Sequence, residues 1–174
     1  VIYADHREKA NGCIKELVDM GVKISLETLE VGDYLLSSRV AVEFKQVQDF
    51  VDSIIDGRLL LQLKNLRKYE KPLIIIEGKD DIYSQRNVHP NAIRGMIATI
   101  TVDYGIPIIR TDTSKETASI MAVIAKREQI DGKQKEFSLH TSKPLSDKEL
   151  QEYIVGSLPG VGGGLAKPLL EKFK

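Results

Sequence analysis

The sequence contains a single cysteine, Cys13, and no tryptophan. A lone cysteine excludes an internal disulfide and fits a reducing intracellular compartment. The histidines, His6, His89 and His140, lie far apart and have no cysteine partners, so a zinc site is not expected. No apolar run approaches the ~20 residues that a membrane-spanning helix needs, and no signal-peptide pattern is present.

Neither sign of charge is in excess, because 25 lysine and arginine residues balance 25 aspartate and glutamate residues. The formal net charge of +0 excludes binding to nucleic acid through bulk charge, so any such affinity must come from local patches. The hydrophobic fraction of 42% and the charged fraction of 29% are those of a soluble globular protein. A chain of 174 residues is long enough for one ordinary domain and a small appendage.

Segments with the periodicity of strands and of helices alternate along most of the chain. Strands are predicted at 1–5, 22–26, 34–36, 40–44, 72–77 and 106–110. Helices are predicted at 8–20, 47–55, 59–69, 91–104 and 114–128. The continuous apolar run at 72–77 is typical of a strand buried on both faces. This alternation predicts an α/β domain with a mixed central sheet flanked by helices.

The composition changes after Ile130, where a polar stretch with few apolar residues reads as a linker. Beyond it, the pattern is helix, glycine-rich turn, helix. We therefore predict a first domain at 1–130, a linker at 131–145 and a short helical segment at 146–174.

The stretch Gly32–Phe50 carries the most information about function. It reads as a hairpin with an acid just before its first strand and an acid on its second strand. Depending on the length of the turn, Asp33 lies opposite Val42 or Glu43, and directly opposed residues have Cβ atoms ~5 Å apart. The hairpin thus predicts that the carboxylates of Asp33 and Glu43 lie close together.

A lysine belongs to the same group. Glu43 and Lys45 are two residues apart on one strand, so they point to the same face, and Asp49, one helical turn further on, can reach back. Converging carboxylates repel each other unless a hard cation such as Mg²⁺ or Mn²⁺ binds them. Such an ion activates water against a phosphodiester, and a lysine steadies the developing negative charge. The same short pattern also occurs on charged, solvent-exposed faces, but its place at a strand end, before a helix, favours a site.

These residues resemble the signature of the XPF/Hef nuclease family, a Gly-Asp pair followed by Glu-Arg-Lys-x-x-x-Asp. The matching positions are Gly32, Asp33, Glu43, Phe44, Lys45 and Asp49. The sequence DHRE at 5–8 is similar to the acidic first-strand motif of the family, and the stretches SIIDGRLLLQLKNL and PLIIIEG resemble the segments that follow. The resemblance covers essentially Val1–Glu128, and several motifs occur in the same order.

The resemblance implies a restriction-endonuclease-like fold and a metal-dependent DNA endonuclease. The enzyme would hydrolyse phosphodiester bonds in branched DNA, of the fork or 3′-flap type, during DNA repair or replication-fork processing. It implies that Asp33 and Glu43 bind Mg²⁺ or Mn²⁺, with Asp5 as a further ligand. It also implies catalytic roles for Lys45 as the lysine of the site and for Arg7. Supporting carboxylates would be Glu8 and Asp49.

One position departs from the family, because Phe44 stands where the family has arginine. By strand alternation its side chain points away from Glu43 and Lys45. The departure keeps open a second hypothesis, a catalytically inactive DNA-binding or scaffold subunit of the same family. A third reading, a Toprim-like motif at Glu77–Asp81, lacks the downstream Asp-x-Asp that such a site needs.

Two further features are expected to contact DNA. The sequence LPGVG at 158–162 is typical of a helix-hairpin-helix motif, in which Gly160 and Gly162 let backbone N–H groups approach a phosphate and Lys167 adds a contact. An ordinary helix–helix turn accounts for the glycines equally well. Following an XPF-like nuclease, the motif is the expected reading, although the family carries two in tandem. Arg58, in a family-like DGR sequence, is the other expected DNA contact.

The resemblance also implies partners. Family members dimerise through the nuclease domain, so we expect a homodimer formed by the apolar helices around 92–103 and 114–130. The chain starts at Val1 within a strand-like run, so we expect a fragment of a longer protein. The likeness to Hef allows a helicase domain upstream. We expect the protein inside the cell, in the cytoplasm of an archaeon or in the nucleus of a eukaryote.

Overall fold

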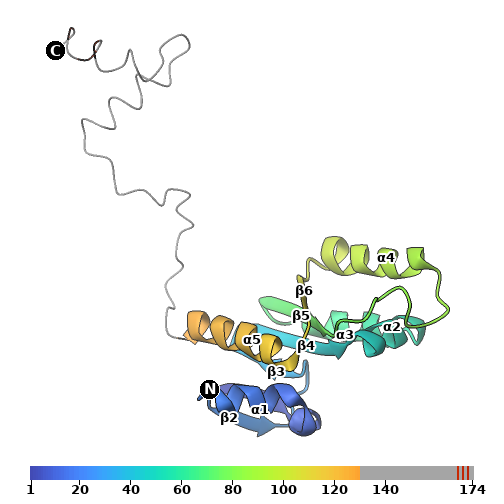
Figure 1. Cartoon of the computed structure of the whole chain (residues 1–174), viewed down its shortest axis with the longest axis horizontal. Helices are drawn as coiled ribbons and strands as arrows, with labels where there is room; N and C mark the ends of the chain where they lie inside the picture. Colours follow the sequence, from blue (N-terminus) through green and yellow to red (C-terminus); the bar gives the residue numbers. More distant parts are fainter. Residues whose placement is uncertain (130–167, 169, 171, 173–174) are drawn as a thin grey trace. The chain divides into compact units, whose positions relative to one another are not determined.

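The computed structural model describes residues 1–129 and, beyond them, Pro168, Leu170 and Lys172 (Figure 1). The chain divides into two units at Gly132. The predicted linker, at 131–145, lies outside the described residues. So do Gly160, Gly162 and Lys167 of the predicted helix-hairpin-helix segment, which therefore remain predictions.

Strands and helices alternate through the first unit, as the sequence predicts. The strands are β1 Ile2–Asp5, β2 Ile24–Glu27, β3 Tyr34–Leu35, β4 Val40–Gln46, β5 Lys71–Glu77 and β6 Ile108–Thr111. The helices are α1 Gly12–Asp19, α2 Val47–Ile55, α3 Arg58–Leu66, α4 Pro90–Ala98 and α5 Ser114–Gln129. A 3₁₀ turn, η1 His6–Ala10, precedes α1, and a π-helical turn, η2 Thr99–Asp103, follows α4.

The strands form one six-stranded sheet in the order β2-β1-β3-β4-β5-β6. β3 is antiparallel to both of its neighbours, β1 and β4, whereas the pairs β1–β2, β4–β5 and β5–β6 are parallel. The predicted mixed sheet flanked by helices is therefore confirmed (Figure 1). β4 lies inside the sheet, with its carboxyl end next to that of β5.

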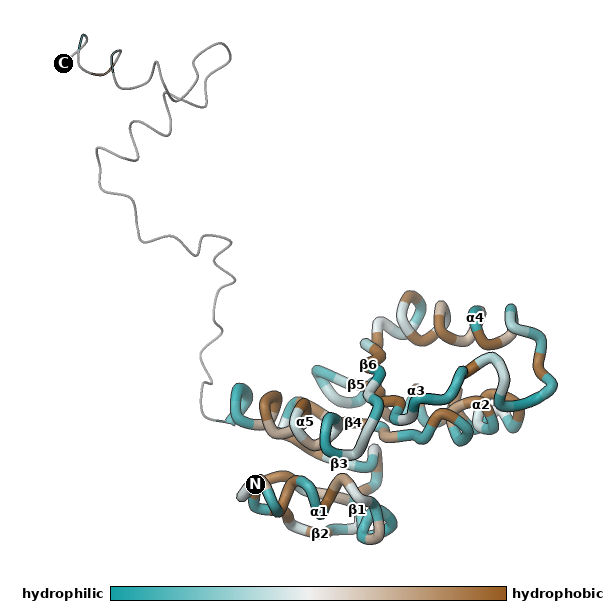
Figure 2. The backbone as a smooth tube through the Cα atoms, in the orientation of Figure 1, coloured by the Kyte–Doolittle hydropathy of each residue, from teal (hydrophilic) through white to brown (hydrophobic). Residues whose placement is uncertain are grey.

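Helices cover both faces of the sheet, and each face has its own hydrophobic core. α1 and α5 pack on one face, around Leu17 and Met121. α2, α3 and α4 pack on the other, around Phe50 and Leu63. Hydrophobic and hydrophilic residues recur in turn along α4 and α5, the pattern of helices with one buried side (Figure 2). Successive residues of β4 divide between the two cores, so the direction of each β4 side chain is fixed by its position.

The predicted helix at 8–20 is wrong in its first turn. The chain forms η1 and then begins a new helix at Gly12, because Asn11 has extended backbone and caps α1 with its side chain. Asn11 Oδ1 accepts a hydrogen bond from the N–H of Cys13 at 3.0 Å, which satisfies one of the free donors at the helix start. The break turns Arg7 and Glu8 out of the line of α1 and leaves them at the end of β1.

The helix predicted at 91–104 is α-helical only in its first part. α4 ends at Ala98, and the chain continues as the π-helical turn η2. The N–H of Ile106 donates to the carbonyl of Ile100 at 3.0 Å, which delays the start of β6 to Ile108. Among the residues that the structure describes, no helix combines the length and the apolar character needed to cross a membrane.

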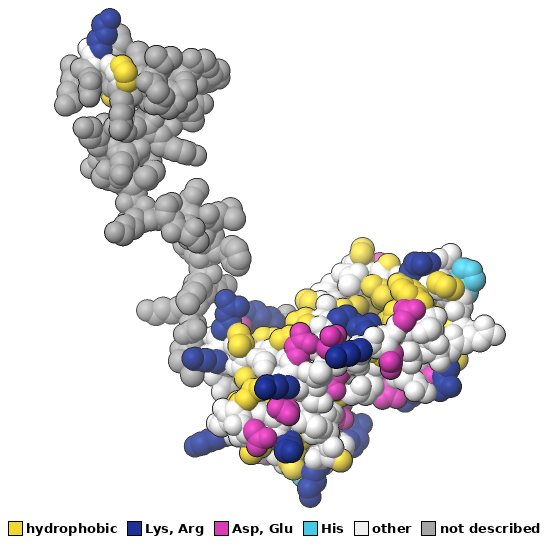
Figure 3. Space-filling model, viewed as in Figure 1, with side chains coloured by type: hydrophobic (Ala, Val, Ile, Leu, Met, Phe, Trp, Pro, Cys, Tyr) yellow, Lys and Arg dark blue, Asp and Glu magenta, His cyan; other side chains and the backbone are white. Residues whose placement is uncertain are grey.

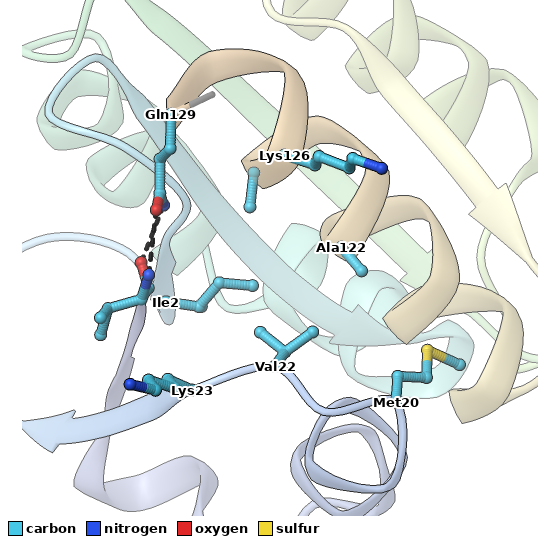
Figure 4. Close-up of a pocket in the computed structure, with 9 residues that line it drawn as sticks. Ile2, Met20, Val22, Lys23, Ala122, Lys126 and Gln129 are labelled. Atoms are coloured by element: carbon cyan, nitrogen blue, oxygen red, sulfur yellow. Dashed lines mark hydrogen bonds between the residues drawn. The ribbon is translucent and has the colours of Figure 1, made fainter. Parts of the chain in front are cut away.

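The end of α5 is tied to the start of β1. Gln129 Oε1 accepts a hydrogen bond from Val1 N at 2.9 Å, and Gln129 Nε2 donates to the Val1 carbonyl at 2.8 Å. A shallow groove of about 360 Å³, with mostly apolar walls from residues such as Val22 and Ala122, lies beside this contact (Figure 4). The groove is on the α1 and α5 face, away from the charged pocket described next.

Candidate active site

The hairpin of β3 and β4 brings Asp33 beside Glu43. Tyr34 pairs with Val42, so Asp33 lies one step beyond, level with Glu43. Asp33 Oδ2 accepts a hydrogen bond from the N–H of Phe44 at 2.8 Å, which fixes the carboxylate against β4. The sequence allows two hairpin registers, and the structure has the one in which Asp33 lies directly opposite Glu43.

Gly32 makes this approach of the two strands possible. Its φ of +76° lies in the left-handed region that favours glycine. A Cβ atom at this position would lie 3.0 Å from the carbonyl oxygen of Val42, which is backbone and cannot move aside cheaply. The glycine that precedes Asp33 is thus explained by steric contact with β4.

Glu43 and Lys45 point to the same side of β4, toward α2 and α3, as the alternation along the strand predicts. Lys45 Nζ lies 3.3 Å from Glu43 Oε1, and the two side chains are only 9% and 7% exposed. Gln62 Nε2, from α3, donates a hydrogen bond to the same Glu43 oxygen. A buried carboxylate is thus held by one cation and one neutral donor.

The pKa values of the paired acids are raised. Burial raises the pKa of Asp33 to about 7, and the neighbouring charge of Glu43 adds to the effect. Burial also raises the pKa of Glu43, against the opposing pull of Lys45. Two carboxylates in this environment repel each other when both are ionised, so a cation placed between them would be stabilising.

The donor set fits a hard divalent cation. Mg²⁺ is usually held by one or two carboxylates and keeps several waters, and Asp33 and Glu43 supply such a pair. Within residues 1–129, no group of three or more His, Cys, Asp or Glu side chains is placed to hold a metal ion. The buried Gln62 Oε1 has no hydrogen-bond partner there, which leaves an acceptor for a water of the site.

Asp5 is engaged differently. Its Oδ1 accepts hydrogen bonds from the N–H of Arg7 at 2.9 Å and from Arg7 Nε at 2.7 Å, and its Oδ2 accepts one from the N–H of Leu29 at 3.0 Å. The Arg7 guanidinium holds the pKa of Asp5 well below its usual range. Asp5 is not among the residues that line the pocket. A metal-binding role for Asp5 would require one of these donors to leave.

Arg7 and Glu8 lie on η1, at the end of β1. The Arg7 side chain is 74% exposed and is held through Nε by Asp5. Glu8 Oε2 accepts a hydrogen bond from Asn11 Nδ2 at 2.7 Å and lies 3.5 Å from the Tyr34 hydroxyl. The structure therefore brings Glu8 to the pocket, while Asp5 serves to hold Arg7.

Asp49 and Arg58 complete the rim from two helices. Asp49 is exposed in the first turn of α2. Arg58 is the first residue of α3 and follows Gly57, whose left-handed backbone (φ +71°) is at the N-cap position of the helix. Arg58 Nε donates a hydrogen bond to Asp56 Oδ2 at 3.1 Å. The pocket between these groups has a volume of about 260 Å³. Its lining residues are Glu8, Asp33, Glu43, Phe44, Lys45, Asp49, Arg58 and Gln62.

Gln62 lines the pocket but was not predicted from the sequence. A signal for it exists, because Arg58 and Gln62 are four residues apart on α3 and side chains at that spacing lie on one face of a helix. If Arg58 is expected at the site, Gln62 is expected there as well.

Phe44 turns its side chain to the other face of the sheet. The ring packs edge-on against Tyr34, with centroids 6.3 Å apart, in the core shared with α1 and α5. The prediction that Phe44 points away from Glu43 and Lys45 is confirmed. Its contribution to the pocket is the backbone N–H that binds Asp33.

The fold places the chain among the α/β domains with a mixed central sheet. The chain belongs to the ERCC4 domain family, which matches residues 4–124. The predicted membership in the XPF-type nucleases is thereby confirmed.

Individual relatives agree with this assignment. The chain is 37% identical to the 3′-flap repair endonuclease Xpf of Saccharolobus solfataricus, over 99% of this chain and 75% of that protein. It is 49% identical, over 99% of its length, to a protein of Methanocaldococcus jannaschii that bears the name of an ATP-dependent RNA helicase. The chain spans only 21% of that relative. The solved structure of XPF from Aeropyrum pernix in complex with DNA matches with a TM-score of 0.75 and 31% identity, over 99% of this chain and 80% of that one.

Proposed function

We propose that this domain is a metal-dependent, structure-specific endonuclease that hydrolyses phosphodiester bonds in branched DNA of the fork or 3′-flap type, in DNA repair or replication-fork processing. The observation that carries the proposal is the buried grouping of Asp33, Glu43 and Lys45 at the end of β4. The name of the Saccharolobus relative and the DNA complex of the Aeropyrum structure support the substrate class.

Asp33 and Glu43 would hold the ion, Mg²⁺ or Mn²⁺. When bound, it would polarise the scissile phosphate and lower the pKa of a water. The Lys45 ammonium, itself buried beside Glu43, stabilises negative charge that develops on the phosphate oxygens. Arg58 is exposed at the rim, where its guanidinium binds a DNA phosphate and fixes the position of the strand.

The remaining acids have supporting roles in the proposal. Glu8 and Asp49 add negative charge at the edge of the pocket, where they orient waters. Asp5 holds Arg7, which does not line the pocket but whose exposed guanidinium offers a second cation to the substrate.

A cleavage assay tests the proposal. Labelled fork and 3′-flap DNA is incubated with the protein and Mg²⁺ or Mn²⁺, alongside Glu43→Gln and Lys45→Met. We expect cleavage by the wild-type protein and a loss of at least about a hundredfold in each variant, the scale found when a charge-stabilising group is removed. Binding without cleavage in either metal would instead support the catalytically inactive scaffold that Phe44 keeps open.

We also propose a homodimer. The predicted helices lie on opposite faces of the sheet, α4 with η2 on one and α5 on the other. Val102, on η2, and Val123, on α5, expose 77% and 56% of their surfaces. Acidic and basic side chains are interspersed over the face shown in Figure 3, so an apolar patch, not bulk charge, is the feature that suits self-association. Light scattering measures the molar mass of Val102→Glu and of the control Val18→Glu, which lies on α1. We expect Val102→Glu to be a monomer and Val18→Glu to remain a dimer.

Two further proposals do not rest on the described residues. The helicase name of the Methanocaldococcus protein supports a helicase domain in the full-length protein. The helix-hairpin-helix contact through Gly160, Gly162 and Lys167 is proposed for DNA binding, and substitution of Lys167 by alanine should weaken affinity for DNA without lowering the rate at saturation.

A further inference from the structure

Gln62 touches the one oxygen of Glu43 that also faces Lys45. Its Nε2 donates to Glu43 Oε1, and Lys45 Nζ lies 3.3 Å from the same atom. The side chain reaches the strand from the second turn of α3, four residues after Arg58. Gln62 therefore joins the helix that carries the exposed arginine to the strand that carries the buried acid.

The chemistry of Glu43 fixes which way the Gln62 amide points. In the structure the NH₂ end of the amide faces Glu43, which is the orientation suited to the ionised carboxylate that a metal ion would favour, since that form only accepts hydrogen bonds. The other end, Gln62 Oε1, is then buried. In the described part of the chain it is the one buried side-chain polar atom without a hydrogen-bond partner. Such an acceptor is destabilising when nothing donates to it, and a retained example calls for a function or a bound water.

We propose that Gln62 is a positioning residue of the cleavage site, a role that rests on the proposed function. Its NH₂ group holds Glu43, and a small rotation of the amide brings its carbonyl oxygen, which is sealed in this structure, to accept a hydrogen bond from the water that attacks the phosphodiester. The pocket supplies the several polar partners that an ordered water needs, from Asp33, Glu43, Lys45 and Gln62.

The chemical step places a limit on this role. In hydrolysis the water oxygen bonds to phosphorus while the bond from phosphorus to the leaving sugar oxygen breaks. The water gives up one proton, and the leaving oxygen gains one. A neutral amide takes neither proton at working pH, so Gln62 acts by fixing the direction of one water O–H and hence of the lone pair that attacks.

The experiment compares Gln62→Met with Gln48→Met. Methionine is close to glutamine in length and helix propensity but can neither donate to Glu43 nor accept strongly from water. Gln48 is an exposed residue of α2 outside the pocket and is the matched control. Single-turnover cleavage at saturating Mg²⁺, DNA affinity in Ca²⁺ and Mn²⁺ affinity without DNA are measured, with thermal unfolding to confirm the fold.

For Gln62→Met we expect a cleavage rate ten- to a hundredfold lower, the usual cost of losing a group that orients a metal ligand, and Mn²⁺ affinity lowered several-fold. DNA affinity should stay within about threefold, because the amide is neutral and its contact is with Glu43 rather than with an exposed cation that binds phosphate. Gln48→Met should match the wild type in all three. A wild-type rate in folded Gln62→Met would overturn the inference, as would a loss confined to DNA affinity.

Gln62→Ala is the second variant. If the methionine side chain lowers the rate merely by crowding the pocket, the alanine variant will cleave at the wild-type rate and the inference is wrong. If both variants are slow, the amide itself is needed. Should the wild-type protein not cleave at all, the proposed function fails, while the comparison of Mn²⁺ affinities still decides whether Gln62 holds Glu43 for the ion.

Discussion

The backbone N–H of Phe44 donates to Asp33 Oδ2 over 2.8 Å, while the side chain of Phe44 packs on the opposite face of the sheet. The residue that departs from the family signature thus orients the first acid of the site through an atom that every residue except proline has. The position of Asp33 does not depend on the missing arginine. This relationship favours the enzyme over the inactive scaffold.

The first prediction concerns Phe44 itself. Because its ring is a core side chain, Phe44→Ala should lower the free energy of unfolding by about 3–5 kcal/mol, as in other buried aromatic truncations. Phe44→Leu should lower it less and should cleave DNA within about threefold of the wild-type rate. Urea unfolding and single-turnover cleavage measure the two effects. A hundredfold loss of rate in a folded Phe44→Leu protein would give the aromatic ring a catalytic role that the geometry does not show.

The second prediction follows from the raised pKa of Asp33, which burial and Glu43 move from 3.8 to about 7. Between about pH 4 and pH 7 the unfolded chain loses the Asp33 proton while the folded protein keeps it. The metal-free protein therefore loses stability as the pH rises through this window, by at most about 1.4 kcal/mol per pH unit from this group.

Asp33→Asn removes that loss and keeps an oxygen that accepts from the N–H of Phe44. In EDTA, its unfolding free energy should exceed that of the wild type by an amount that grows from pH 4 to pH 7 and then levels off. Chemical unfolding across the pH range measures the difference. A constant difference at every pH would show that Asp33 is ionised in the folded protein and that the acids do not repel.

The third prediction concerns Asp5 and Arg7. The Arg7 guanidinium lowers the pKa of Asp5, so the stabilisation is present above the unfolded pKa near 4 and is lost as the pH falls below it. Asp5→Asn should lower stability by about 1–3 kcal/mol at pH 7, the range for hydrogen bonds to charged groups. The difference from the wild type should shrink at pH 3. Mn²⁺ affinity should change little, and a large loss of it would make Asp5 a metal ligand after all.

The fourth prediction concerns Arg58 at the rim of the pocket. Its guanidinium is exposed, and within residues 1–129 its ion-pair partner is the exposed Asp56, so it is available to a phosphate. Arg58→Ala should weaken DNA binding and reduce the slope of log affinity against log salt by about 1, the effect of one phosphate contact. Fluorescence anisotropy at several salt concentrations measures this. Arg127→Ala, on the helix α5 of the opposite face, is the control and should leave the slope unchanged.

The centre of the site could be predicted from the sequence because strand geometry is strict. A two-residue period fixes that Glu43 and Lys45 share a face and that Phe44 does not, and a short hairpin limits Asp33 to two registers. The sheet type followed in the same way from alternating strand and helix patterns. These inferences depend on local geometry and needed no knowledge of distant contacts.

The remaining features depend on contacts that local patterns do not encode. Asn11 delays the start of the predicted helix to Gly12 because its side chain caps α1, a competition between two local structures that periodicity does not resolve. Asp5 looks like a metal ligand in sequence, yet its oxygens are taken by Arg7 and by Leu29, which is 24 residues away. The role of Gln62 rests on a contact between α3 and β4, and only the folded chain brings those together.

The most direct test of the account is the position of a manganese ion. Crystals of the protein are soaked in Mn²⁺, and the anomalous signal locates the ion relative to Asp33 and Glu43. We expect a peak bound by both carboxylates, about 2.0–2.3 Å from their oxygens, with Lys45 alongside. A fully occupied ion elsewhere on the domain, with none between these two side chains, would contradict it.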